Sequence, residues 1–261
     1  MATLSNYLFV TGALTLAFAF VLAVAYTTML AVGRRATRTS VVNDTGPRLA
    51  TAGGPSGAGA LALGPSSPLG ATTVGALAHG LTVVAFLLLV SSLATRAVIV
   101  ERGPWGNMYE ISIAFAVGIL GGYLFLQRRY PIRSISFLPL GVALFLAGYA
   151  ATLPATIEPL VPALDNPALL TVHVAMAMIA YGVLAVSFAA AVGYLAQGQT
   201  DRYSWLPSHK VLDEVAYRSV IIGFPIFATM IILGSYWASI AWGRYWGWDP
   251  KETSALVTWL I

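Results

Sequence analysis

The chain opens on the stretch MATLSNYLFVTGALTLAFAFVLAVAYTTMLAVG, residues 1–33, in which no Asp, Glu, Lys or Arg occurs. An α-helix crosses the hydrocarbon core of a bilayer with about 20 apolar residues, so this stretch is long enough to span a membrane. No basic residue precedes the apolar run, and the run is longer than the core of a cleaved signal peptide. The opening stretch therefore predicts a membrane-spanning helix that stays in the protein.

The composition of the whole chain also predicts a membrane protein. Of the 261 residues, 58% are hydrophobic and 9% are charged, and the mean hydropathy is +0.78. Soluble domains carry about 25% charged residues, so a soluble enzyme, a disordered chain and a free nucleic-acid-binding protein are excluded. The absence of cysteine excludes disulfides, thiolate metal sites, iron–sulfur clusters and cysteine nucleophiles. Catalysis or metal binding must therefore use the three histidines, the few carboxylates or a cofactor.

Hydropathy predicts an all-α fold, a polytopic transmembrane helix bundle with six complete spans and the start of a seventh. The expected complete spans are residues 7–32, 73–95, 110–126, 135–153, 167–196 and 219–242. A last apolar stretch, residues 253–261, is too short to cross a bilayer. We therefore expect the sequence to stop inside a seventh span.

Positive charges predict how these spans are oriented. Four Lys and Arg residues fall on one side of the predicted bundle: Arg96, Arg102, Arg244 and Lys251. The other ten lie in the alternate connections, and cytoplasmic loops are enriched in Lys and Arg, so we expect the N-terminus outside. The expected organisation is a first span (residues 1–33), a flexible cytoplasmic linker (residues 34–72) and a transmembrane core (residues 73–261).

Four of the seven tryptophans lie within twelve residues, namely Trp237, Trp242, Trp246 and Trp248. Three of them belong to the sequence WGRYWGWDPKE, residues 242–252, which leaves the sixth span on the outer side. Pro250 after Asp249 predicts a turn that opens the next helix, with Asp249 near its N-cap. An aromatic belt explains one or two tryptophans at a helix end. The alternative is an apolar platform for a large planar ligand with a polar edge, which the glycines would allow to approach closely.

This loop resembles the tryptophan-rich WWD signature of the heme-handling proteins of cytochrome c biogenesis, and most closely that of the CcsA/ResC-type subunit of the System II cytochrome c synthase. Residues 105–110, WGNMYE, resemble the Asn-x-Tyr-Glu segment of that family at the start of a span. Residues 171–176, TVHVAM, resemble the segment that carries its first external histidine. These segments stand in the family's order, and the resemblance covers about residues 78–261. It implies that residues 73–261 form a heme-handling core.

His173 is the main candidate for binding heme iron. It lies near the outer start of the fifth expected span, and a neutral imidazole is a normal axial ligand of heme. Taken alone, an apolar-flanked histidine is more often a structural residue, but the resemblance implies that His173 is the axial ligand. His79, within the second span, is either a functional group or a hydrogen-bond partner of a neighbouring helix. His209 is expected in a solvated loop.

The resemblance also implies a set of residues that bind the cofactor heme b: His173, Trp237, Trp242, Trp246, Trp248, Asp249 and Arg244. Arg244 and Lys251 are candidates for pairing with heme propionates, and the alternative is contact with lipid headgroups. Asp249 and Glu252 are expected to shape the loop. Glu110 either stabilises a helix N-terminus or supports the tryptophan loop by pairing with Arg244 or Lys251.

The function implied by the resemblance is cytochrome c biogenesis, as the heme-handling subunit of a lyase-type holocytochrome c synthase. The protein would present reduced heme b to an apocytochrome c outside the bacterial cytoplasmic membrane, or in the equivalent thylakoid compartment. Thioether bonds would then form with the thiols of a Cys-x-x-Cys-His motif. Positioning would supply much of the rate advantage, without a covalent catalyst in this chain. The implied partner is a ResB/CcsB-type membrane subunit.

Three other functions stay open at this point. A System I-type heme chaperone would share the tryptophan signature and pass heme to a carrier without forming the bond. A transporter unrelated to heme would use His79 as a proton or substrate group, and a structural assembly factor would use the tryptophans to dock a partner. In the family, a second external histidine and an intramembrane histidine follow the tryptophan motif, so we expect these ligands to lie beyond Ile261.

Overall fold

The computed structural model describes residues 2–43, 69–157 and 167–261, and every regular element in these ranges is a helix. The elements are α1 (Ala2–Asn43), α2 (Leu69–Val100), α3 (Met108–Gln127), the short 3-10 helix η1 (Arg133–Ile135), α4 (Phe137–Ala151), α5 (Pro167–Gln197), α6 (His209–Trp242) and α7 (Pro250–Leu260). Six of these helices are long and apolar enough to cross a membrane. The predicted polytopic all-α bundle is therefore confirmed, and the chain is a multi-pass membrane protein.

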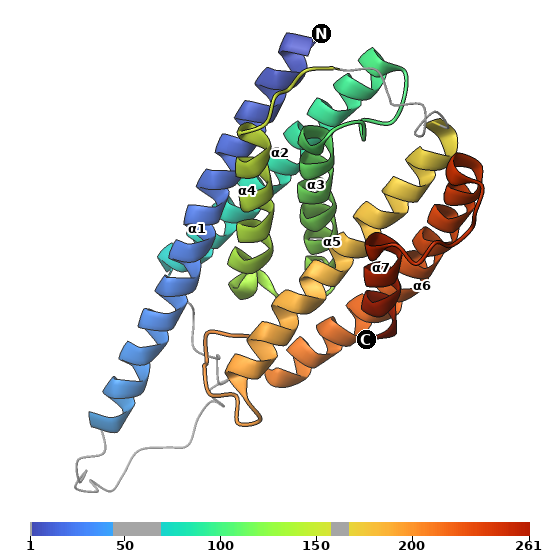
Figure 1. Cartoon of the computed structure of the whole chain (residues 1–261). Coiled ribbons are helices and arrows are strands. Elements are labelled where there is room, and N and C mark those ends of the chain that lie inside the picture. Colours follow the sequence, from blue (N-terminus) through green and yellow to red (C-terminus); the bar gives the residue numbers. More distant parts are fainter. Residues whose placement is uncertain (1, 44–68, 158–166) are drawn as a thin grey trace, which may run out of the picture.

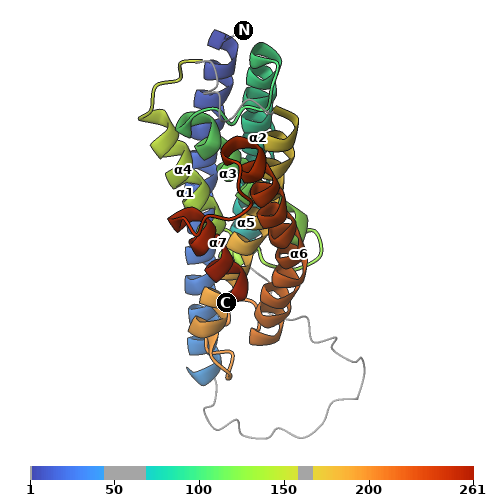
Figure 2. The same cartoon turned by 45° about the vertical axis from the view of Figure 1, so that its right-hand side comes forward.

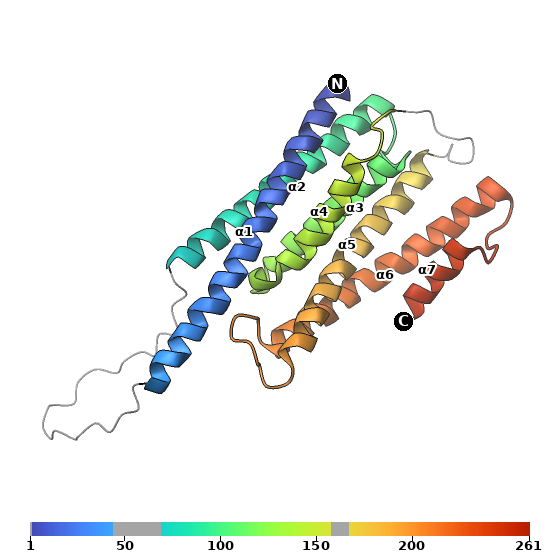
Figure 3. The same cartoon turned by 60° about the vertical axis from the view of Figure 1, so that its left-hand side comes forward.

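The helices run up and down, so that two ends of the bundle can be distinguished (Figure 1). The end that carries the α2–α3 loop (residues 101–107) and the α6–α7 loop (residues 243–249) is called the tryptophan end. The opposite end carries the α3–α4 turn (residues 128–136) and the α5–α6 loop (residues 198–208), and is called the arginine end. Helix α5 packs on both α3 and α6. Figures 2 and 3 show α7 returning along α6 from the tryptophan end.

Helices α1, α2 and α6 extend further than the expected spans. Helix α1 continues to Asn43 and α2 begins at Leu69, so both margins of the predicted linker are helical. Residues 44–68 of that linker lie outside the described residues. Helix α6 begins at His209 and not at residue 219, because its first turns are polar and hydropathy detects only the apolar part of a helix. His209 is consequently a helix residue, in contrast to the predicted loop position.

Helices α3 and α5 cross at a contact between glycines. A Cβ atom added to Gly122 would lie 2.8 Å from the carbonyl oxygen of Gly182, and one added to Gly118 or Gly182 would overlap the backbone of the other helix. Small residues at such crossings allow the backbones of membrane helices to approach closely. The crossing fixes the position of α5, which carries His173, relative to the rest of the bundle.

A buried ion pair holds the α2–α3 loop at the tryptophan end. Arg96 Nε donates to Glu110 Oε1 over 2.8 Å, and the two side chains are 2% and 0% exposed. The Arg96 guanidinium also donates to the carbonyl oxygens of Ala155 and Thr156, over 3.1 and 3.3 Å. Glu110 lies in the first turn of α3, as one of its two interpretations expected. The alternative interpretation, in which Glu110 pairs with Arg244 or Lys251, is wrong, because Arg96 from α2 is the close partner of this carboxylate.

Candidate functional site

A cavity of about 490 Å³ lies between α5, α6, α7 and the α6–α7 loop. Five of the predicted site residues line it: His173, Trp237, Trp242, Trp246 and Asp249. They come from α5, from α6 and from the loop that follows α6. Pockets for small molecules have volumes of about 300–1,000 Å³ and mostly apolar walls with a few polar groups. The size of this cavity and its mixture of indoles with one imidazole are typical of such a pocket.

The imidazole of His173 is held by the backbone of α6. Its Nδ1 atom lies 2.9 Å from the carbonyl oxygen of Met230, and a carbonyl oxygen can only accept. Nδ1 therefore carries the proton, and the lone pair of Nε2 stays available to a metal ion. Gly234 makes the close approach of the ring possible, because a Cβ atom there would lie 2.8 Å from His173 Cε1. The geometry thus prepares His173 as a ligand through Nε2.

The indoles of the site are arranged in two edge-to-face pairs. The rings of Trp237 and Trp242 are 4.7 Å apart with an interplanar angle of 72°, and those of Trp246 and Trp248 are 5.8 Å apart at 86°. Edge-to-face contacts of this kind stabilise the orientation of aromatic rings. The Nε1 atom of Trp246 is buried and has no hydrogen-bond partner within the described part of the chain. The indole N–H of Trp246 is therefore a buried donor that the described residues leave unused.

The start of α7 is closed by a capping box, which confirms the predicted turn. Asp249 is the N-cap and its Oδ1 accepts from the backbone N–H of Glu252 over 2.8 Å, while Pro250 takes the first helical position. Glu252 Oε2 accepts in turn from the N–H of Gly247 over 2.7 Å and from that of Asp249 over 3.4 Å. These bonds fold the loop back, so that Trp246 faces α5 and α6 across the cavity.

Two predicted site residues do not line the cavity. The side chain of Trp248 is 70% exposed, on a backbone with the left-handed φ of 55°. Arg244 is exposed too, and its guanidinium packs on Gly247, where a Cβ atom would lie 2.8 Å from Arg244 Cζ. Lys251 lines the cavity in contrast to Arg244, so it is the cation nearest to a ligand there.

The other two histidines lie away from this cavity. His79 Nδ1 accepts from Gln127 Nε2 of α3 over 3.0 Å, which agrees with its interpretation as a hydrogen-bond partner of a neighbouring helix. His209 contacts Asp201: its backbone N–H donates to Oδ1 over 2.7 Å, and its Nδ1 lies 3.1 Å from the same oxygen. The bond from the backbone N–H of His209, more than any charge, lowers the pKa of Asp201.

Several wall residues were not among the sequence-based candidates, and they include Tyr181, Met230 and Gly234. Helical periodicity contains the signal for Tyr181, because residues 173, 177 and 181 recur at i, i+4 and i+8 and share one face. Met230 and Gly234 are also one turn apart on α6. The sequence alone does not show which face of α6 turns toward His173, and for that reason Gly234 could not be distinguished from the other glycines of the spans.

Comparison with known proteins connects this site to a family. Residues 105–261 match the model of the family described as Cytochrome C assembly protein. The curated relatives include the cytochrome c biogenesis protein CcsA of Guillardia theta, 30% identical over 211 residues, which are 71% of this chain and 70% of the relative.

Two cyanobacterial relatives carry the same name. The CcsA protein of Gloeothece citriformis is 30% identical over 233 residues (68% of this chain, 71% of the relative), and that of a Synechococcus strain is 33% identical over 213 residues (69% and 68%). The family match includes the last residues of the α2–α3 loop, His173 and the whole tryptophan loop. The chain therefore belongs to the cytochrome c assembly protein family, as a protein of the CcsA type that takes part in cytochrome c biogenesis.

Proposed function

We propose that the cavity between α5, α6 and α7 binds heme b as a substrate, with His173 Nε2 as an axial ligand of the iron. The observation that carries this proposal is the bond from His173 Nδ1 to the Met230 carbonyl oxygen, which leaves Nε2 unprotonated at the cavity wall. Histidines that ligate metals are commonly oriented by such a bond from the other ring nitrogen. No cluster of three or more His, Cys, Asp or Glu occurs in the described residues. A single histidine therefore suits heme iron, which the porphyrin already ligates, better than a bare metal ion.

The surrounding residues bind and orient the macrocycle in this proposal. Trp237, Trp242 and Trp246 supply flat apolar contacts for a porphyrin edge. Lys251 pairs with a propionate from its position on α7. Asp249 and Glu252 act on the loop and not on the ligand, because both carboxylates are engaged in the capping box.

The protein then presents this heme to apocytochrome c on the outer side of the membrane. Bound heme supplies two vinyl groups, and each thiol of a Cys-x-x-Cys-His motif adds its sulfur to one vinyl carbon and its proton to the next. The chain itself contributes position, and holding two reactants together replaces a costly bimolecular encounter. A ResB/CcsB-type membrane subunit completes the synthase, in the bacterial cytoplasmic membrane or in a thylakoid membrane.

His173→Ala tests the role of the histidine in the protein produced in its own membrane. We expect the variant to lose heme on purification, seen as a loss of Soret absorption of about tenfold or more, and to lower the yield of c-type cytochromes. His209→Ala is the matched control, since His209 lies at the arginine end and touches Asp201. Added imidazole is expected to restore the spectrum of the His173→Ala variant, because it can enter the space of the deleted ring.

Other outcomes would support the other functions. Unchanged Soret absorption and unchanged cytochrome yield in the His173→Ala variant would contradict the proposal and favour a transporter unrelated to heme. A Trp246→Ala variant that keeps its heme and loses its membrane partner would favour a structural assembly factor. Heme delivered to a carrier protein, without thioether formation, would favour a System I-type chaperone.

A further inference from the structure

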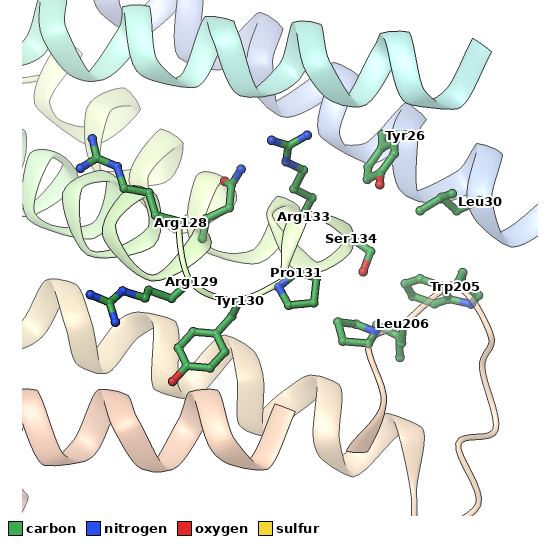
Figure 4. A pocket seen from close by; sticks show the side chains of 12 residues that line it. Tyr26, Leu30, Arg128, Arg129, Tyr130, Pro131, Arg133, Ser134, Trp205 and Leu206 are labelled. Carbon is green, nitrogen blue, oxygen red and sulfur yellow. The ribbon is translucent and has the colours of Figure 1, made fainter. Parts of the chain in front are cut away.

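A second cavity, of about 720 Å³, lies at the arginine end, opposite to the cavity of His173. Its walls come from three parts of the chain: the second half of α1, the α3–α4 turn and the α5–α6 loop. Figure 4 shows Arg133 and Ser134 on the turn, Tyr26 on α1 and Trp205 on the loop. Segments distant in sequence therefore build this cavity together.

The charged residues that the structure describes around this cavity are all basic. Arg128, Arg129 and Arg133 line it, and none of the described Asp or Glu residues does. None of these three arginines has a carboxylate within ion-pair distance among residues 2–43, 69–157 and 167–261. Glu214, in the first turns of α6 at the same end, pairs with Arg218 over 2.7 Å. Three exposed guanidinium groups that share a cavity without a counter-charge make it attractive to anions.

The walls are held in place by buried hydrogen bonds. Thr27 Oγ1 of α1 donates to the carbonyl oxygen of Ser134 over 3.0 Å, which ties the α3–α4 turn to α1. The side chain of Gln197, in a residue that is 1% exposed, donates to the carbonyl oxygens of Tyr203 and Pro207 over 3.0 and 2.9 Å. It also accepts from the N–H of Tyr203 over 2.8 Å. The α5–α6 loop is thus fixed to the end of α5, and the α3–α4 turn to α1, so two of the walls are held in place.

We propose that this cavity binds the headgroup of an anionic phospholipid, which the arginines of the α3–α4 turn attract together. Guanidinium groups bind phosphate oxygens through paired N–H donors, and basic pockets between transmembrane helices suit anionic headgroups. The apolar part of the wall selects the lipid over a free phosphate ion. Tyr26 and Leu30 belong to the membrane-spanning part of α1, so they meet the glycerol and the first acyl carbons where the phosphate meets the arginines.

The test compares two triple variants that remove three positive charges from the same end of the molecule. The cavity variant is Arg128→Gln with Arg129→Gln and Arg133→Gln, and its matched control is Arg202→Gln with Lys210→Gln and Arg218→Gln. Both are reconstituted with the wild type in bilayers of equal phosphatidylglycerol and phosphatidylcholine, and retained lipid is counted by native mass spectrometry. One arginine near an anionic lipid contributes about fivefold in affinity, so we expect the cavity variant to retain phosphatidylglycerol about a hundredfold less. The control is expected to match the wild type.

Each remaining outcome bears on the proposal. Equal losses in both triple variants would indicate general surface attraction and overturn it. Inorganic phosphate is also titrated into lipid-free protein and into the lipid-bound sample. If the concentrations that saturate the lipid-free protein also displace the lipid, the proposal of a lipid site is overturned and the cavity is a site for free phosphate. If the cavity variant is not recovered as folded protein, Arg133→Gln alone replaces it. That single variant is expected to lose about fivefold, and unchanged retention would contradict the proposal.

Discussion

At the scale of single residues, the position of His173 depends on a carbonyl group that already serves its own helix. By helical geometry, the Met230 carbonyl accepts from the N–H of Gly234 one turn later, and it also accepts from His173 Nδ1. A carbonyl oxygen has two lone pairs, so both bonds can coexist. The second lone pair is accessible because Gly234 has no side chain to cover it. One missing Cβ atom thus decides where the imidazole lies.

Gly234→Ala should therefore displace His173 without removing it. The new methyl group would lie 2.8 Å from Cε1 and 3.2 Å from Nδ1, and the ring must turn away from Met230. We expect heme affinity to fall about tenfold or more, with a changed ligand-field spectrum, which absorption spectroscopy of the purified protein measures.

Gly148→Ala is the control for this prediction. Gly148 is a helical glycine of α4 with no heavy atom within 4 Å of an added Cβ, so the control tests the effect of an added methyl group alone. Equal heme content in the Gly234→Ala variant and the control would mean that the Met230 bond does not orient the ligand.

At the scale of elements, the starts of α3 and α7 are built in the same way. Residues 105–110 and 246–252 both begin with Trp-Gly and end with a glutamate at the third helical position. In both, an Asn or Asp N-cap accepts from the N–H of that glutamate, over 2.9 and 2.8 Å. In both, the glutamate accepts from the N–H of the glycine over 2.7 Å. One motif thus closes the loop before each helix, although only the second borders the His173 cavity.

Asp249→Ala should loosen the start of α7. Loss of an N-cap costs about 0.5–2 kcal/mol, and α7 has only 11 residues to compensate for it. Hydrogen exchange in residues 250–260 is expected to become faster, and heme content should fall because Trp246 is no longer held across the cavity.

Thr258→Ala serves as the control on the same helix. Its hydroxyl bonds only within α7, to the carbonyl oxygen of Ser254, and the side chain is exposed. The prediction is wrong if Asp249→Ala leaves hydrogen exchange in α7 at the level of this control.

The sequence predicted the elements better than their ends. Long apolar runs are sufficient to identify six spans, and the dipeptide of Asp249 and Pro250 is sufficient to place the start of α7. Hydropathy missed the first ten residues of α6, because this part of the helix is polar. The ion pair of Glu110 with Arg96 was also not predicted, because Arg96 lay beyond the expected second span. In the structure α2 continues to Val100, and Arg96 is buried. Which helix faces meet is a tertiary property without a local signal.

At the scale of the whole molecule, the expected orientation in the membrane can be tested with two introduced thiols. The natural chain has no cysteine, so each new thiol is a unique reporter. Tyr245→Cys lies at the tryptophan end and Ser204→Cys at the arginine end, and both positions are exposed. With the N-terminus outside, we expect a membrane-impermeant maleimide to label only Tyr245→Cys in intact cells.

Labelling of both variants after permeabilisation is the control that both thiols are reactive. Labelling of Ser204→Cys alone in intact cells would reverse the expected orientation and place the His173 cavity on the cytoplasmic side.

The ion pair of Arg96 and Glu110 connects three parts of the molecule, because Arg96 also binds the carbonyl oxygens that follow α4. Arg96→Met should destabilise the protein by about 3–5 kcal/mol, since it leaves a buried carboxylate without its main partner. Arg96→Met combined with Glu110→Leu should regain much of this loss, as apolar pairs often replace buried ion pairs without cost.

Thermal unfolding in detergent measures both variants. The Arg218→Met variant is the control, because its ion pair with Glu214 is exposed and contributes little. A double variant as unstable as the Arg96→Met single variant would contradict the proposed cause of the loss.

The glycine crossing of α3 and α5 has a consequence for the gene. Glycine is the smallest residue, so every codon change at positions 118, 122 or 182 that replaces it adds at least one carbon atom, which the opposite backbone leaves no room for. A saturation library selected for cytochrome c production should therefore return glycine at these three codons. Gly80 and Gly148, which face open space, should accept alanine freely. The lipid-facing surface of this bundle can therefore change one residue at a time. The distance between α3 and α5 cannot, because each single replacement of these glycines meets the opposite backbone.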